Sequence, residues 1–204
     1  ARVKGLERVV VATDDRRIYD CVHRFGGEAV MTAKNLASGS DRVAAAIARI
    51  PCDWVLNVQG DEPLVSPAVL SALLRRAKSY SRPAILTVVS PIQAAGDRGD
   101  PNTVKAVFGA DGRAFYFSRS AIPSGTGAVW KHQGIYLFHR LALLKFVKTP
   151  PTLLEKRERL EQLRAIEAGI PIYVVRTRSA PVAVDIPGDI SRVENLLRKE
   201  RSAQ

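Results

Sequence analysis

The sequence has few cysteines and histidines, and it has no long apolar run. Cys21 and Cys52 are the only cysteines in 204 residues, too few for a disulfide framework and without C-x-x-C spacing. The three histidines form no pattern of metal ligands. No stretch approaches the roughly 18 apolar residues of a membrane-spanning helix, and the N-terminus has no signal-peptide pattern. We therefore expect a cytoplasmic protein without membrane insertion, in which both cysteines are reduced core thiols.

Nucleic-acid-binding motifs are also absent, although the chain is strongly basic. It contains 31 Lys and Arg against 20 Asp and Glu, a formal net charge of +11. Nucleic-acid binding, a pocket for small anionic substrates and a basic solvated surface all explain such a surplus. The basic residues are scattered, and no helix-turn-helix, zinc-finger or RNP pattern is present. This favours small anions over nucleic acid as partners and leaves the solvated surface open.

Strand-like and helix-like segments alternate over the first 90 residues. Short apolar runs predict strands at residues 7–12, 28–31, 54–58 and 85–89. Apolar residues at helical spacing predict helices between these strands, the second capped by Ser40 and the third starting at Ser66-Pro67. The β-α-β-α-β-α-β order predicts an α/β fold with a doubly wound, mostly parallel, Rossmann-like sheet.

The second half departs from this alternation. Three short strands without intervening helices predict an antiparallel ribbon over residues 101–140, added to the sheet. The segments that follow are predicted as a helix at 154–168, a strand at 172–175 and a helix at 189–198. No linker divides the chain, so residues 1–204 are predicted to form a single domain, and this length can bury a full core.

Acidic residues follow two of the predicted parallel strands. Asp14 comes after the first strand, and Asp61-Glu62 come after the third. Ligands of an open α/β sheet bind outside the carboxyl ends of its strands, and Mg²⁺ favours one or two carboxylates together with phosphate oxygens. Asp185, much further along the chain, can converge on the same cation. The plainer interpretations, a helix N-cap for Asp14 and a turn at Asp61–Pro63, stay open.

A series of ordered motifs resembles the 3-deoxy-manno-octulosonate (Kdo) cytidylyltransferases, the CMP-Kdo synthetases. The segment Asn57-Val58-Gln59-Gly60-Asp61-Glu62-Pro63 is similar to the central signature of that family. Similar segments extend along the whole chain: Val11–Asp14, Ser38–Arg42, Pro101–Lys105, Tyr116–Pro123, His132–Tyr136, Leu160–Arg164 and Val184–Pro187. Several motifs in one order are far more specific than any single one.

The resemblance implies a nucleotidyltransferase fold of the GT-A-like type and a homodimer, for which the ribbon at 101–140 is a candidate interface. It implies Mg²⁺-dependent transfer of CMP from CTP to Kdo, giving CMP-Kdo and pyrophosphate for lipopolysaccharide biosynthesis. An amino-substituted Kdo or another 2-keto sugar acid is the alternative acceptor. A non-catalytic nucleotide-binding domain is the alternative from another class.

The resemblance also implies roles for individual residues. The metal would be held by Asp61 and Asp185, with Gln59 in contact with the sugar or with the groups around the metal. The Kdo pocket would be lined by Arg119, His132, Tyr136, Glu161 and Gln162. The nucleotide side would contain Ser38, Arg42 and Asp14. Each of these residues has an ordinary structural alternative, such as a surface strand, a loop or a helix cap, and Glu62 is either near the metal or only part of the turn.

The family opens with a strand and a basic, glycine-containing loop that grips the CTP phosphates. Residues 1–5 resemble the end of the helix that follows this loop. We therefore expect that the sequence omits an N-terminal segment, so that only part of the nucleotide site can be assigned.

Overall fold

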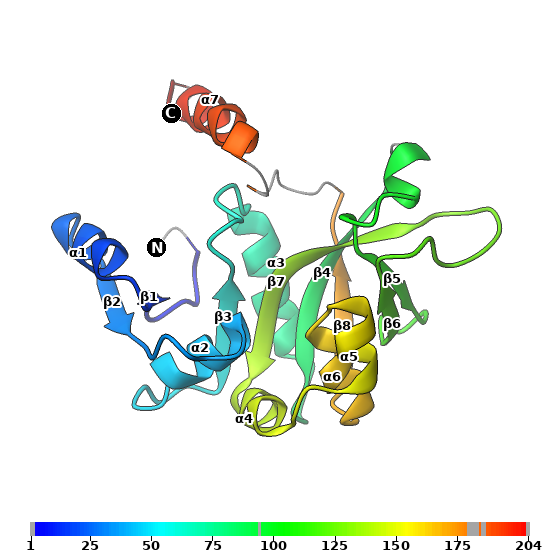
Figure 1. Cartoon of the computed structure of the whole chain (residues 1–204), viewed down its shortest axis with the longest axis horizontal. Helices are drawn as coiled ribbons and strands as arrows, with labels where there is room; N and C mark the ends of the chain where they lie inside the picture. The colour runs from blue at the N-terminus through cyan, green and yellow to red at the C-terminus, as the bar shows by residue number, and fades with distance from the viewer. Residues whose placement is uncertain (1–2, 94, 179–183, 185–186, 203–204) are drawn as a thin grey trace.

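The computed structural model of the chain describes residues 3–93, 95–178, 184 and 187–202 (Figure 1). The strands are β1 (Val10–Thr13), β2 (Glu28–Met31), β3 (Trp54–Val58), β4 (Ile85–Pro91), β5 (Lys105–Phe108), β6 (Ala114–Ser118), β7 (Trp130–His139) and β8 (Ile172–Arg176). The helices are α1 (Arg16–Arg24), α2 (Gly39–Ala46), α3 (Pro67–Ala77), α4 (Arg140–Lys148), α5 (Leu153–Glu158), α6 (Gln162–Glu167) and α7 (Pro187–Ser202), with a 3₁₀ helix at Ala95–Arg98. Each predicted strand and helix overlaps an observed element.

Strand β7 organises the larger of two sheets. The strand order of that sheet is β6-β5-β7-β4-β8, and β3 also pairs with β7. β7 runs antiparallel to β3, β4 and β5, whereas β4 and β8 are parallel. β1 and β2 form a separate parallel pair, at the left of Figure 1. The predicted α/β class is therefore confirmed; of the antiparallel strands, β6 and β5 lie at one end of the strand order, whereas β7 lies between β3 and β4.

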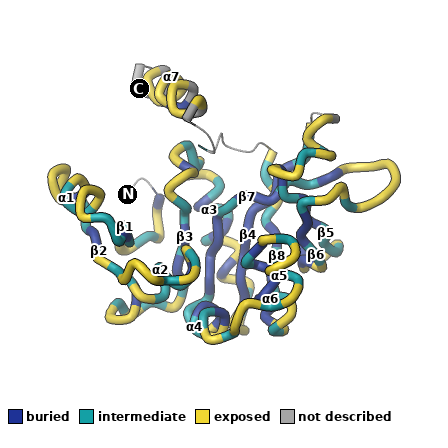
Figure 2. The backbone as a smooth tube through the Cα atoms, viewed as in Figure 1, coloured by how far each residue is buried: buried dark blue, intermediate teal, exposed yellow. Residues whose placement is uncertain are grey.

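Residues 135–138 of β7 suit a central position, because they are apolar on both faces. Tyr136 and Phe138 belong to one buried cluster, with Phe146 of α4 and Leu163 of α6. Ile135 and Leu137, which point to the opposite face of the strand, belong to a second cluster, formed with α3. Helix α3 thus covers one face of the sheet and α4 with α6 the other, which leaves the strands dark in the burial view (Figure 2). A strand buried on both faces reads as a continuous apolar run rather than as an alternating one.

Two helix starts differ from the prediction by one or two residues. Asp15, not Asp14, is the N-cap of α1, and its side chain accepts a hydrogen bond from the Arg17 backbone N–H. Ser38, not Ser40, is the N-cap of α2, accepting from the backbone N–H of Asp41. In each case the residue predicted to cap the helix is left to contact other parts of the chain. The predicted start of α3, with Ser66 as N-cap and Pro67 as first residue, is confirmed.

The single helix predicted over residues 154–168 is two helices. Arg159 adopts a left-handed conformation with φ of 55° and ends α5. A non-glycine residue in this region costs free energy and interrupts the helical hydrogen bonds, so the chain turns before α6 begins. The turn buries Leu160 at 6% exposure and Gln162 at 4%. The prediction was wrong because amphipathic spacing alone does not reveal a left-handed residue.

Both cysteines are free as expected, but Cys21 is exposed on α1 and is not a core residue. No helix among the described residues combines the length and apolarity needed to cross a membrane.

Candidate active site

A break along one edge of β7 brings three of the sequence motifs together. β3 pairs with residues 135–139 of β7, and β5 pairs with residues 130 and 131. β4 pairs with both of these stretches, so β3 and β5 share the opposite edge of β7. The carboxyl end of β3 and the start of β5 therefore face each other across residues 132–134. Open α/β sheets bind their ligands outside the carboxyl ends of their strands, and the carboxyl end of β3 is such a place.

The chain turns sharply as it leaves β3. The backbone N–H of Glu62 donates to the carbonyl of Gln59 at 3.1 Å, so the predicted turn exists. The turn leaves Asp61 exposed and Glu62 buried. The backbone N–H of Val184 donates to the Asp61 carbonyl at 2.8 Å. Asp185 itself lies outside the described residues, but the residue directly before it is thus held against Asp61.

Gln59 depends on a glycine on the neighbouring strand. A Cβ built on Gly134 would lie 3.3 Å from both Cδ and Oε1 of the Gln59 side chain. Because Gly134 has no side chain, the Gln59 carboxamide can lie across β7 at the break between β3 and β5. The motif that contains Gly134 therefore provides space as well as side chains.

His132 is fixed beside this gap by a buried threonine. Its Nε2 is 2.8 Å from Oγ1 of Thr87 on β4, and its ring contacts those of Phe117 and Tyr136, with centroids 4.9 and 5.4 Å apart. Burial lowers the pKa of His132 from its ordinary 6.5 to about 3. The imidazole is therefore neutral at physiological pH, and the expected pocket residue is not a cation.

Tyr136 brings a second set of polar groups to the same face of the sheet. Its hydroxyl donates to Oε1 of Gln162 at 3.2 Å. Asn57 of β3 is its partner in the β3–β7 register. The amide nitrogens Nδ2 of Asn57 and Nε2 of Gln162 are both buried, and neither has a hydrogen-bond partner among the described residues. Unsatisfied buried donors are rare, so both are candidates for contacts with a ligand.

Arg119 lies at the end of β6 and is held by backbone carbonyls. Its Nε donates to the Glu158 carbonyl at 3.1 Å and its Nη1 to the Pro101 carbonyl at 3.0 Å. It forms no ion pair with any described carboxylate. The buried Lys105 ammonium donates to the carbonyls of Asp100, Thr103 and Arg119, which ties the same backbone segments together. The guanidinium thus has a defined position and no carboxylate bonded to it among the described residues.

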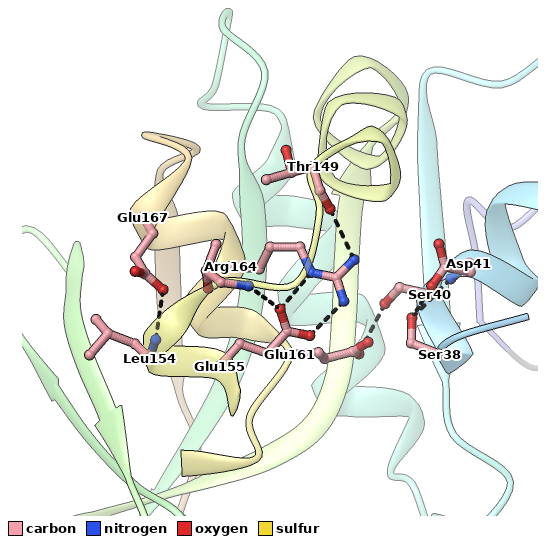
Figure 3. A network of polar contacts seen from close by, with 10 residues as sticks. Ser38, Ser40, Asp41, Thr149, Leu154, Glu155, Glu161, Arg164 and Glu167 are labelled. Atoms are coloured by element: carbon pink, nitrogen blue, oxygen red, sulfur yellow. Dashed lines mark hydrogen bonds and ion pairs between the residues drawn. The ribbon is translucent and has the colours of Figure 1, made fainter. Parts of the chain in front are cut away.

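Glu161 connects this region to α2. Ser40 is fully buried and donates to the Glu161 carboxylate at 3.0 Å (Figure 3). Burial raises the pKa of the Glu161 carboxyl, and the hydrogen bond from Ser40 opposes that shift. Figure 3 also shows a neighbouring pair, Glu155 with Arg164, in which the carboxylate oxygens accept at 2.5 and 2.8 Å. These contacts fix the segment that carries Glu161 and Gln162.

The three residues predicted for the nucleotide side are engaged with one another or with α2. Arg42 forms an ion pair with Asp14 at 3.0 Å, and its Nη1 donates to the Thr32 hydroxyl. Ser38 caps α2 and donates to the Asp41 carboxylate at 2.7 Å. These contacts account for their positions within the protein, and a nucleotide role for them stays a prediction.

Within the described residues, contacts at the end of β3 and the adjoining part of β7 link several predicted site residues: Gln59 lies against Gly134, and Tyr136 contacts both His132 and Gln162. Residues 1–176 match the sequence model of a cytidylyltransferase family.

The chain belongs to this cytidylyltransferase family.

Several curated relatives of this cytidylyltransferase carry the same enzyme name. The 3-deoxy-manno-octulosonate cytidylyltransferase of Myxococcus xanthus is 47% identical over 201 residues, which covers 96% of this chain and 81% of the relative. The enzyme of the same name from Geobacter sulfurreducens is 40% identical over 97% of this chain and 85% of its own length. The family resemblance predicted from the motifs is confirmed.

One solved structure agrees with this assignment, and a second shares the fold. A CMP:2-keto-3-deoxy-manno-octonic acid synthetase complexed with CTP has a TM-score of 0.92 and 35% identity, and the match covers 98% of this chain and 84% of that one. A putative glucose-1-phosphate thymidylyltransferase from Bacillus anthracis, in complex with a sucrose, has a TM-score of 0.63 at 10% identity over 94% of this chain and 75% of its own. The second match shows the shared fold alone.

Some polar residues of this cytidylyltransferase site were not identified from the sequence. Asn57 interrupts the apolar run of β3 at a core-facing position, and that interruption is the signal that could have marked it. Glu158 accepts from the Tyr116 and Ser118 hydroxyls and from the Arg119 backbone N–H, and so organises the end of β6. Its partners are about 40 residues away in the chain, so local patterns could not reveal it.

Proposed function

We propose that this cytidylyltransferase transfers CMP from CTP to Kdo, releasing pyrophosphate. The observation that carries the proposal is the match over 98% of the chain, at 35% identity and a TM-score of 0.92, to a CMP:2-keto-3-deoxy-manno-octonic acid synthetase complexed with CTP. The anomeric oxygen of the sugar forms a bond to the α-phosphorus, the bond from that phosphorus to the β-phosphate oxygen breaks, and the hydroxyl proton is released. CMP-Kdo and pyrophosphate are the products.

The sugar acid fits the groups beside the end of β3. Its carboxylate would be bound by Arg119, because a guanidinium binds a carboxylate bidentately and this one has no carboxylate partner among the described residues. Its hydroxyls would meet the unpaired amides of Asn57 and Gln162 and the Tyr136 hydroxyl. The site thus offers the Arg119 guanidinium and several neutral hydrogen-bonding groups, which suit a carboxylate and a polyhydroxyl chain.

A divalent cation fits the other side of the site. Mg²⁺ commonly takes one or two protein carboxylates and completes its coordination with phosphate oxygens and water. Asp61 is exposed at the end of β3, and the Val184–Asp61 hydrogen bond brings the residue before Asp185 to it. Asp61 and Asp185 would hold the ion, Asp185 on the sequence resemblance alone. When bound, Mg²⁺ supplies positive charge that stabilises the phosphoryl oxygens and the pyrophosphate leaving group.

The test is formation of CMP-Kdo and pyrophosphate from CTP and Kdo, followed by mass spectrometry and a pyrophosphate assay. Asp61→Asn should lower turnover by about 100-fold or more, because the carboxylate that would bind the metal is lost. Asp53→Asn is the matched control, since Asp53 is also exposed and lies just before β3, at its opposite end. Equal turnover in the two variants would contradict the role of Asp61, and failure of the unaltered protein to form CMP-Kdo would contradict the function.

The homodimer implied by the family resemblance remains part of this proposal. Phe115 on β6, within the segment at 101–140, is 57% exposed and is a candidate contact between two copies. Light scattering after gel filtration measures the mass directly, and a mass near 22.3 kDa, that of one chain, would contradict a dimer.

A further inference from the structure

Thr87 occupies an irregular point of the sheet. The register between β4 and β7 shifts between Thr87 and Val88, where Thr87 pairs with Tyr136 and Val88 pairs with Gln133. A shift of this kind leaves carbonyls of the longer strand without their ladder partners, and it re-aims nearby side chains. Thr87 is fully buried at this point, with an exposure of 0%.

The Thr87 hydroxyl meets two kinds of partner. Its Oγ1 is 2.9 Å from the carbonyl oxygen of Ile135 and 3.4 Å from that of Gln133. It is also 2.8 Å from Nε2 of His132. Carbonyl oxygens can only accept, and a hydroxyl has one proton to donate. The Ile135 carbonyl at 2.9 Å can only accept the Thr87 proton, and when it does so the hydroxyl oxygen accepts the Nε2–H of His132.

This assignment determines the other ring nitrogen. The buried His132 is neutral, because burial lowers its pKa to about 3, so its ring carries one proton only. With that proton on Nε2, Nδ1 is an acceptor. Nδ1 makes no hydrogen bond to any described residue, and it is not among the fully enclosed polar atoms that lack a partner. Nδ1 of His132 is therefore an unprotonated nitrogen that no described residue donates to.

We infer that Thr87 is a positioning residue that holds His132 in the Nε2–H tautomer, and that Nδ1 of His132 accepts a hydrogen bond from a hydroxyl group of the acceptor sugar. An unprotonated Nδ1 can only accept a hydrogen bond, and so can the sugar carboxylate, so the two cannot bind each other. His132 therefore binds a hydroxyl of the sugar, while Arg119 binds its carboxylate. This inference rests on the proposed function for the identity of the ligand, but the tautomer is a property of the protein alone.

The first experiment measures the tautomer without substrate. The chain has three histidines, so long-range ¹H–¹⁵N correlation spectra are simple, and a His132→Gln variant assigns the signals of His132. We expect a protonated Nε2 and a bare Nδ1 in the unaltered protein and in Thr87→Ser. Thr87→Val, which keeps the shape and removes the hydroxyl, should lose this single tautomer. A protonated Nδ1 in the unaltered protein would overturn the inference.

The second experiment measures kinetics with CTP and Kdo. Thr87→Val should raise the KM for Kdo about threefold to tenfold, the equivalent of one hydrogen bond, and leave the KM for CTP unchanged. Thr87→Ser should restore the KM for Kdo. Thr177→Val is the matched control, because Thr177 carries its hydroxyl next to Gln133, the residue beside His132. An unchanged KM for Kdo in Thr87→Val, or an equal rise for both substrates, would overturn the role of Thr87.

A panel of singly deoxygenated Kdo analogues identifies the hydroxyl. For the analogue that lacks the hydroxyl bound by Nδ1, Thr87→Val should not raise the KM further. For the other analogues, Thr87→Val should still raise the KM. A penalty that persists for every analogue would contradict recognition of a hydroxyl. If the unaltered protein does not turn over Kdo at all, the proposed function fails, and the spectra still decide the tautomer.

Discussion

The ion pair between Glu155 and Arg164 should contribute strongly to stability, and Glu155→Gln tests this. The two side chains are only 13% and 4% exposed, and the carboxylate accepts from both Nε and Nη2 of Arg164 at 2.8 and 2.5 Å. Oε2 of Glu155 also accepts from the backbone N–H of Thr152 at 3.2 Å. The pair holds the start of α5 against α6 (Figure 3).

The expected loss follows from the burial of the cation. Glutamine retains the size of Glu155 and one acceptor oxygen, but it leaves the buried guanidinium without a compensating charge. Removing one partner of a buried pair typically costs about 3–5 kcal/mol, and we expect the lower end, about 3 kcal/mol, because that acceptor remains. For a chain of this length such a loss lowers the unfolding temperature by roughly 6–12 °C.

Urea denaturation followed by circular dichroism measures the free energy of unfolding. Asp20→Asn is the control, because its pair with Arg16 is largely exposed and should contribute less than about 1 kcal/mol. Removing both charges, with Glu155→Gln and Arg164→Met together, should cost less than the sum of the single changes. A loss below about 1 kcal/mol for Glu155→Gln, or strict additivity in the double variant, would refute the reasoning.

Two further predictions concern the candidate active site. Gly134→Ala should lower turnover by about threefold or more with little change in stability, because the new Cβ would lie 3.3 Å from the Gln59 carboxamide and displace it; Gly96→Ala, where a Cβ meets nothing within 4 Å, is the control in the same assay. His132 should reduce the free energy of unfolding in acid. Its pKa is about 3 in the folded protein and 6.5 ordinarily, so the unfolded chain binds a proton that the folded protein does not. The stability that the neutral His132 contributes above pH 6.5 is therefore lost as the pH falls toward 3. Denaturation curves from pH 7 to 4 should show a weaker pH dependence for His132→Gln, and equal slopes would contradict the burial of a neutral imidazole.

Structural features that depend on neighbouring residues could be predicted from the sequence. The strand of residues 54–58, its acidic end and the start of α3 at Ser66-Pro67 all depend on apolar runs, turn residues and caps within a few positions. The ordered motifs are specific enough to identify the family without the tertiary structure. They also selected most of the residues that surround the end of β3.

Features that depend on distant contacts could not be read in this way. A left-handed Arg159 splits the helix predicted at 154–168, and amphipathic spacing is the same on either side of it. The caps of α1 and α2 shifted because Asp14 pairs with Arg42 and Ser40 binds Glu161, partners 28 and 121 residues away. Local propensity does not record such partners.

The sequence by itself therefore determined the class of fold, the family and the identity of most candidate site residues, because these rest on local patterns and ordered motifs. Only the tertiary structure decided that β7 lies between β3 and β4, and that β3 and β5 share one edge of it. The pairing of β4 with β7 places Thr87 against His132 and so selects one tautomer of the ring. Strand register and the position of a single proton depend on contacts between segments that are far apart in the chain, so they form only when the sheet does.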